Sequence, residues 1–143
     1  MQFAYPAVFY ESDGAYVVEV PDLPGCVSWD DTLAGAINMG IEAASGWLLC
    51  DIEEGKPIPK ASHVADIRPD PEIGENAFVT MLVLDMDAFE KKYGKKSVRK
   101  SFTIPAWLNA YAESNGISYS EVLRESLTDM YVREHQVPYE AVK

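Results

Sequence analysis

The sequence predicts an α+β protein in which a β-β-α-β unit is followed by a separate strand-helix-helix unit. Two aromatic and β-branched runs near the N-terminus, and a later stretch with apolar residues at three- and four-residue intervals, indicate the first unit. A change in charge marks the second unit. Residues 1–94 hold 17 acidic and 5 basic side chains, a net charge of −12, whereas residues 95–143 hold 6 and 7, a net charge of +1. The net charge of −11 for the whole chain argues against a protein that coats nucleic acid nonspecifically.

The first two runs, residues 3–12 and 14–23, are separated by a Ser-Asp-Gly turn sequence. Because Asp and Gly tolerate the backbone angles of a tight turn, the two runs are expected to form an antiparallel hairpin. The following segment, residues 21–31, contains two prolines and a glycine, and is expected to leave the sheet as a loop.

A helix of about six turns is predicted from Leu33 to Ile52 by its apolar spacing. Asp31 or Thr32 can cap its start, and a glycine and a proline after it supply the stop. Residues 56–76, with four prolines, are expected to be irregular surface chain.

The almost continuous apolar run at residues 77–87 predicts a third strand that pairs with the hairpin and suits the middle of the sheet. Residues 88–96 follow as a short helix that runs into a lysine-rich linker. This basic cluster lies where the second domain is expected to begin, and a merely solvated linker is the alternative interpretation.

Residues 98–104 alternate between polar and mainly apolar side chains, so a strand here would have one polar face and one mainly apolar face. Pro105 suits the first turn of a helix that Asn115 and Gly116 would end. Ser118 or Ser120 would then cap a second helix, with Ser118 and Glu121 at the spacing of a capping box.

A single seven-residue strand beside two short helices cannot bury enough apolar surface to be stable, so this unit is expected to pair with a second copy. Antiparallel pairing of the two strands would create a shared core and leave a polar two-stranded ribbon that fits the major groove of DNA. The N-terminus of the second helix would present backbone N–H groups to a phosphate. The predicted dimer core comprises Val98, Phe102, Ile104, Leu108, Val122 and Leu123, with Trp107 covering it. The predicted DNA-binding residues are Lys96, Arg99, Lys100, Ser101, Thr103, Ser118 and Ser120. The alternative for the strand is an exposed edge kept soluble by polar residues.

Residues 97–132 resemble the ribbon-helix-helix family of bacterial repressors in the strand-proline junction, the G-I-S-Y-S turn and their spacing. The resemblance implies that Arg99, Ser101 and Thr103 face the groove and that Ser118 to Ser120 anchor a phosphate. Lys100 departs from the family pattern, which usually has an apolar residue there, and is expected to fray or to contact a backbone phosphate.

Residues 5–62 resemble the N-terminal domain of HicB-type antitoxins in the Y-P-A start, the V-P-D-L-P-G-C loop, the D-T-L-A-x-A helix entry and the G-x-x-I-P exit. The resemblance implies a partial, catalytically silent ribonuclease H-like fold that binds a small basic HicA-like toxin, an mRNA-cleaving protein. It also implies the antitoxin of a type II toxin-antitoxin pair, which represses its own operon. The predicted organisation is a toxin-binding domain at 1–90, a basic linker at 91–96, a ribbon-helix-helix domain at 97–134 and a tail at 135–143 that is loose or straps a partner. A homodimer is expected, with a tetramer left open.

Partner contact is predicted for Glu19, Asp22, Pro24 and Trp29, although the loop around Pro24 could be purely structural and Trp29 could close the core instead. Glu19, Asp22, Asp30 and Asp31 are the candidates for a metal-dependent nuclease, but their positions do not suggest two converging metal sites. His63 and His135 have no partner at a catalytic spacing. The sequence therefore predicts no enzyme, no metal and no cofactor.

Two cysteines, Cys26 and Cys50, are expected to be buried or half-buried free thiols. No apolar run of membrane-spanning length and no signal peptide is recognised, so a cytoplasmic protein without membrane contact is expected. A ribbon-helix-helix repressor whose first domain senses a small ligand is the alternative to the antitoxin.

Overall fold

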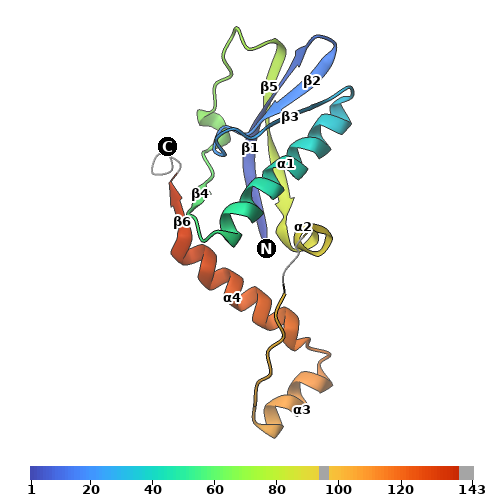
Figure 1. Ribbon diagram of the computed structural model, residues 1–143, viewed down its shortest axis with the longest axis vertical. Helices are drawn as coiled ribbons and strands as arrows, with labels where there is room; N and C mark the ends of the chain where they lie inside the picture. Colours follow the sequence, from blue (N-terminus) through green and yellow to red (C-terminus); the bar gives the residue numbers. More distant parts are fainter. Residues whose placement is uncertain (94–96, 139–143) are drawn as a thin grey trace.

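The computed structural model describes residues 1–93 and 97–138 (Figure 1). A four-stranded antiparallel sheet has the strand order β3-β2-β1-β5, and one long helix, α1, covers one of its faces. The strands of the sheet are β1 (Gln2–Ser12), β2 (Ala15–Glu19), β3 (Val27–Asp30) and β5 (Glu75–Asp85). The helices are α1 (Leu33–Glu53), α2 (Met86–Tyr93), α3 (Ala106–Ser114) and α4 (Tyr119–His135). The mixed architecture agrees with the predicted α+β class.

The predicted hairpin is confirmed as β1 and β2, with Ser12 opposite Ala15 at its closed end. Asp13 and Gly14 have φ angles of 50° and 80°, the left-handed backbone that a tight turn requires of these residue types.

The prediction of an uninterrupted loop at residues 21–31 is wrong, because Val27–Asp30 form β3 and pair antiparallel with β2. Three backbone hydrogen bonds close the preceding loop: Leu23 N–H donates to Val20 O, Cys26 N–H to Leu23 O, and Val20 N–H to Cys26 O. The loop thus brings the chain back beside β2. Residues Val27–Asp30 form a strand because β2 lies next to them there.

Helix α1 begins and ends as predicted. Of the two candidate caps the structure uses Thr32, whose hydroxyl oxygen accepts a hydrogen bond of 3.0 Å from Gly35 N–H. Gly55, with φ of 70°, follows the helix. A Cβ atom on Gly40 would lie 2.9 Å from Val18 and 3.1 Å from Leu82, so this glycine lets α1 approach the sheet closely.

Within the described residues α1 is the one helix whose length and composition match those of a membrane-spanning segment. No segment of membrane-spanning length was predicted from the apolar runs of the sequence. Core helices can also have this length and composition, and Ala36, Ala44 and Leu48 of α1 are fully buried in the core that the helix forms with the sheet.

Strand β5 pairs with β1 as predicted, but it lies at the edge of the sheet rather than in the middle. Its alternate residues explain why. Leu82 and Leu84 are buried in the core, whereas Met81 and Val83 are 40% and 55% exposed. The apolar run therefore fills one face of an edge strand, not two faces of a central one.

The connection from α1 to β5, expected to be irregular, contains the short strand β4 (Ile58–Lys60) and the 3-10 helix η1 (Val64–Asp66). Two buried side chains of the sheet unit attach this connection to the sheet by hydrogen bonds. Tyr5 Oη donates a hydrogen bond to Pro59 O, and Asp22 accepts from Ser62 N–H at 2.8 Å and from Ser62 Oγ at 2.5 Å.

Both predicted C-terminal helices are confirmed as α3 and α4. Pro105 precedes α3, and Asn115 with Gly116, whose φ is 62°, ends it. Helix α4 begins at Tyr119, so Ser118 is the cap, with its hydroxyl 3.4 Å from Glu121 N, and Ser120 lies inside the first turn. Residues 97–105 form no strand within the single chain.

Helix α4 returns to the sheet unit rather than ending in free solvent (Figure 1). Tyr131 and Val132 pack against the core, and Tyr131 Oη donates a 3.3 Å hydrogen bond to Ile52 O at the end of α1. The tail predicted from residue 135 begins with β6 (Gln136–Pro138), which pairs in parallel with β4 of the same chain.

Candidate functional site

The C-terminal unit exposes an unusual amount of apolar side chain. No residue of α4 is buried, and Ala112 is the buried residue of α3. We call the following set the C-terminal apolar surface: Val98, Phe102, Trp107, Leu108, Tyr111, Val122, Leu123, Leu127 and Met130. Its exposed fractions reach 82% for Val98 and 72% for Trp107. A surface of this kind on a small unit marks an interaction site.

Five of the six predicted dimer-core residues belong to this surface, and the sixth, Ile104, is half-buried. The ring of Phe102 packs edge-on against Tyr119 at 5.6 Å, and Tyr119 Oη donates a 2.6 Å hydrogen bond to Asn109 Oδ1. The extended segment is therefore already attached to α3 and α4, while most of the remaining apolar surface stays open.

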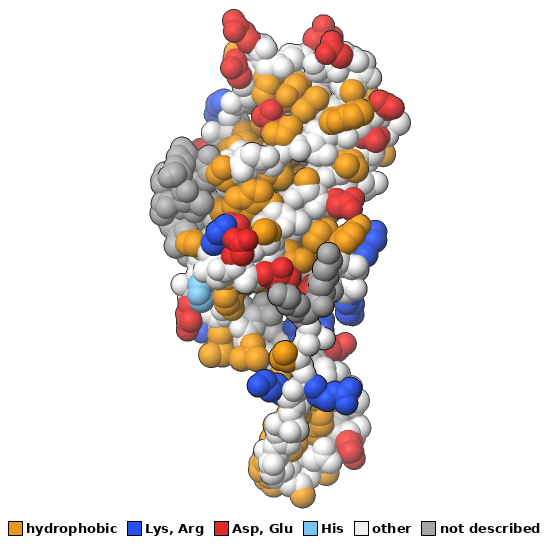
Figure 2. All heavy atoms as spheres, in the orientation of Figure 1, with side chains coloured by type: hydrophobic (Ala, Val, Ile, Leu, Met, Phe, Trp, Pro, Cys, Tyr) orange, Lys and Arg blue, Asp and Glu red, His pale blue; other side chains and the backbone are white. Residues whose placement is uncertain are grey.

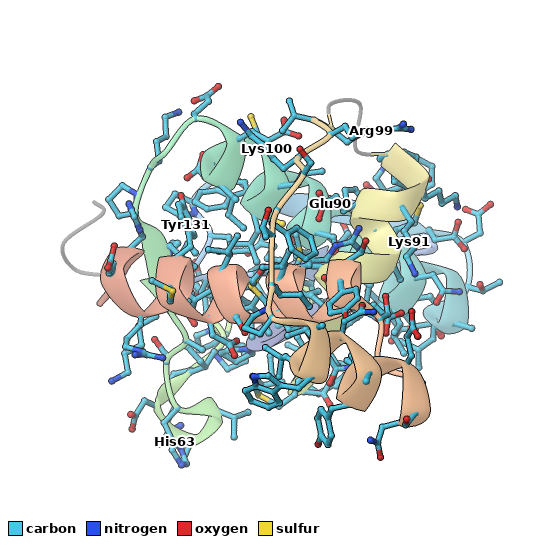
Figure 3. The ribbon with its side chains drawn as sticks, turned by 90° about the horizontal axis from the view of Figure 1, so that it is seen from below. His63, Glu90, Lys91, Arg99, Lys100 and Tyr131 are labelled. Atoms are coloured by element: carbon cyan, nitrogen blue, oxygen red, sulfur yellow. The ribbon has the colours of Figure 1, made fainter. Side chains whose placement is uncertain are left out.

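The predicted DNA-binding side chains of the extended segment, Arg99, Lys100, Ser101 and Thr103, are all exposed. In the part of the chain that is described, no hydrogen bond or ion pair engages them. Figure 3 shows Arg99 and Lys100 projecting from the segment that joins α2 to α3. Lys96 lies outside the described residues. Figure 2 shows acidic side chains over the upper part of the sheet unit and Lys and Arg side chains where the C-terminal unit begins.

Glu19 and Trp29 come together on the sheet face opposite α1. Gly40 of α1 contacts Val18, so the alternate residues of β2, including Glu19, point to the other face. Trp29 lies opposite Val17 in β3, is 61% exposed and shares that face. Glu19 accepts a 3.1 Å hydrogen bond from Tyr10 Oη, and burial together with this carboxylate raises the pKa of Tyr10.

Asp22 and Pro24 have different surroundings. Asp22 is 1% exposed and both of its carboxylate oxygens accept hydrogen bonds from Ser62, so its observed role is to hold the connection to the sheet unit. Burial, followed by the charge of Asp22, raises the pKa of nearby Tyr5. Pro24 is exposed, and its carbonyl accepts a 3.1 Å hydrogen bond from Trp47 Nε1 of α1.

The acidic candidate Asp30 also has a local partner. Asp30 Oδ2 accepts hydrogen bonds of 3.1 Å from both the N–H and the hydroxyl of Thr32. Across residues 1–93 and 97–138, no group of three or more His, Cys, Asp or Glu side chains is arranged to hold a metal ion. Of the two free cysteines, Cys26 is buried as expected, but Cys50 is exposed.

A model of the HicB-like antitoxin family of bacterial toxin-antitoxin systems matches residues 5–126. The chain belongs to this family. The matched range begins in β1 and ends within α4, so it includes both the sheet unit and most of the unit with the C-terminal apolar surface.

Solved structures of HicB-like proteins have the same fold. The Burkholderia pseudomallei antitoxin HicB is 27% identical, with coverage of 90% of this chain and 96% of that chain and a TM-score of 0.52. A toxin-antitoxin complex from Streptococcus pneumoniae contains a chain that is 22% identical, with coverage of 91% and 99% and a TM-score of 0.57, a similarity of fold. An uncharacterized 14.9 kDa protein from the rep-hol intergenic region of Haemophilus phage HP1 is 32% identical over 104 residues, 73% of this chain and 74% of the phage protein.

The HicB-like chain has one further feature that sequence reasoning missed, a cavity of about 520 Å³ between its two units. The end of α1, the N-terminal Met1, the first half of α2 and the middle of α4 surround it. Most of its lining residues are apolar, and three have charged side chains, Glu53, Glu90 and Arg124. Its α4 residues, Arg124, Leu127, Thr128 and Tyr131, are not among the predicted site residues, and no local sequence signal distinguishes them.

Proposed function

We propose that this antitoxin neutralises a small basic, mRNA-cleaving HicA-like toxin by direct binding and represses its own operon through a DNA-binding homodimer. The observation that carries the proposal is the family match across residues 5–126. The solved toxin-antitoxin complex of the same fold agrees with it. The chain would act stoichiometrically, as a protein without catalytic activity, metal or cofactor.

The C-terminal apolar surface supports the homodimer. Two copies that pair residues 98–104 antiparallel would bring Val98 and Phe102 of both chains into one core with the exposed faces of α3 and α4. Burial of this surface would provide the favourable free energy that the isolated unit lacks. Such a ribbon-helix-helix dimer would be formed by residues 97–134. Two of these dimers could further assemble into a tetramer.

The polar side of the same segment supports DNA binding. Arg99, Ser101 and Thr103 alternate with the apolar residues, so strand pairing would place them together on the outside of a two-stranded ribbon. Arg can donate two hydrogen bonds to guanine, and Ser and Thr can reach several base edges. Lys96, Lys100, Ser118 and Ser120 would contact backbone phosphates around the ribbon.

The sheet unit, residues 1–90, is the proposed toxin-binding domain. Its acidic balance suits a basic partner, because opposite charges speed the encounter of two proteins. Trp29 and Pro24 offer an exposed aromatic ring and loop to such a partner, and half-buried Glu19 offers a carboxylate on the face of Trp29. Asp22 would contribute indirectly, by holding the connection in place behind them.

Co-expression tests the antitoxin role. The tagged chain is produced together with the product of the short neighbouring reading frame, and co-purification and ribonuclease activity are measured. A stable complex without ribonuclease activity is the expected result. A chain that purifies alone and leaves the neighbour's activity unchanged would refute it.

A ligand-sensing repressor is the second candidate, and the cavity between the units favours it. A small molecule bound there would touch both the end of α1 and the middle of α4, and so could couple the two units. The same purification distinguishes the candidates, since a chain that purifies alone although the neighbour's product is co-expressed, and still binds its promoter, would support ligand sensing.

A further inference from the structure

Strand β5 leaves one long edge of the sheet open. It is eleven residues long and pairs with β1 on one side only. Helix η1 of the connection lies against β5, but among the described residues no backbone hydrogen bond joins the connection to this strand. The outer N–H and C=O groups of β5 are therefore available to another strand.

Natural proteins usually protect such an edge, and the opposite edge of this sheet is protected. Strand β3 has four residues, follows a loop with prolines and a glycine, and leads directly into the cap of α1. Strand β5 has no proline, no glycine and no lysine, and its two charged residues, Glu75 and Asp85, are at its ends. By these criteria β5, not β3, is the edge to which a strand can add.

Side chains on both faces of β5 would gain from an added strand. Phe78, stacked on Phe9 at 5.2 Å, is 40% exposed on the α1 face, and Met81 and Val83 are 40% and 55% exposed on the other. An added strand would cover parts of all three residues and complete the pairing of the backbone.

The charges beside the edge indicate the kind of partner. A groove of about 300 Å³ lies between α1, α2 and the lower half of β5, and the carboxylates of Glu42 and Asp85 line it with one cation, Lys92. Glu75 marks the other end of the strand. This surplus of carboxylates disfavours a second copy of the same acidic chain and favours a basic protein.

We infer that the open edge of β5 binds an extended strand of a basic partner protein by sheet addition. The inference rests on the proposed function, in which that partner is the toxin. Backbone hydrogen bonds between β5 and the added strand would provide affinity. The apolar residues Phe78, Met81 and Val83 would select which side chains the added strand can carry.

Two lysine substitutions test the site. Val83→Lys places a charge on the proposed edge, and Met39→Lys is its control, because Met39 is 39% exposed and belongs to α1 rather than to the sheet or to the proposed contacts Glu19, Pro24 and Trp29. The full-length chain is titrated with the purified product of the neighbouring short reading frame. Val83→Lys should weaken binding by about tenfold or more, since it opposes a basic partner, while Met39→Lys should change it less than about twofold.

Hydrogen exchange of the complex tests strand addition itself. Amides within residues 78–83 should exchange more slowly when the partner is bound. Thermal unfolding confirms that each variant is folded, and Met81→Lys replaces Val83→Lys if the latter is not. Wild-type affinity in the folded β5 variants, or new protection confined to β3, would overturn the edge assignment and leave toxin binding intact. A wild-type chain that does not bind the neighbouring product would overturn the proposed function and this inference with it.

Discussion

Replacing Phe102 with alanine should weaken the proposed homodimer strongly. The side chain is 52% exposed in the single chain. A Phe side chain has roughly 200 Å² of surface, so about 100 Å² remains open for a partner copy to bury. At about 25 cal/mol per Å² this corresponds to ~2.5 kcal/mol per chain, or ~5 kcal/mol for the two copies in a dimer. The dissociation constant of the dimer should therefore rise by a factor of roughly 10³ to 10⁴.

Sedimentation equilibrium over a range of protein concentrations measures this constant directly. Thr103→Ala is the matched control, because Thr103 lies on the same segment but on its polar side, and this variant should dimerise like the wild type. Since Phe102 also packs on Tyr119 within its own chain, circular dichroism must show that α3 and α4 remain helical. A Phe102→Ala variant with the dissociation constant of the wild type would refute strand pairing through this face.

Three further predictions concern DNA binding and stability. Arg99→Ala and Thr103→Ala should each weaken operator binding by about 1–3 kcal/mol in a mobility-shift assay at physiological salt, while toxin binding is unchanged. Unchanged operator affinity in either variant would show that this residue does not contact the major groove. Asp22→Ala should lower the free energy of unfolding by about 2–4 kcal/mol in urea, because the part-buried N–H and hydroxyl of Ser62 lose their acceptor. A variant as stable as the wild type would contradict this role. Burial raises the pKa of Cys26 from 9.0 to about 11, so above pH 9.0 the unfolded chain releases a proton that the folded chain retains, and stability should fall as the pH rises toward 11. Between pH 9.0 and 11 the free energy of unfolding should fall by about 2 kcal/mol less in Cys26→Ala than in the wild type. If the free energies of unfolding of the two proteins fall in parallel with pH, the thiol is not the cause.

Local patterns were sufficient to predict most helices and the hairpin. The spacing of apolar residues from Leu33 to Ile52, the turn at Asp13 and Gly14, and the stop at Gly116 each depend on neighbouring residues, and the structure confirms all of them. The alternation in residues 98–104 likewise predicts which side chains would share the polar face and which the apolar face of a strand. In the single chain residues 98–103 are exposed on both sides, so the pairing of the apolar side with a second copy remains a proposal.

Contacts between distant segments decided the rest. Strand β3 exists because a hydrogen-bonded loop returns Val27–Asp30 to β2, and β5 lies at an edge because β1 already has β2 on its other side. Asp22 is buried because Ser62, 40 residues later, supplies both of its hydrogen-bond donors. The sequence by itself thus determined the elements, the charge division and the candidate residues of the C-terminal unit, since each depends on side chains close together in the chain. Only the tertiary structure decided which face and which edge of the sheet remain open, because that depends on which distant segments cover the others.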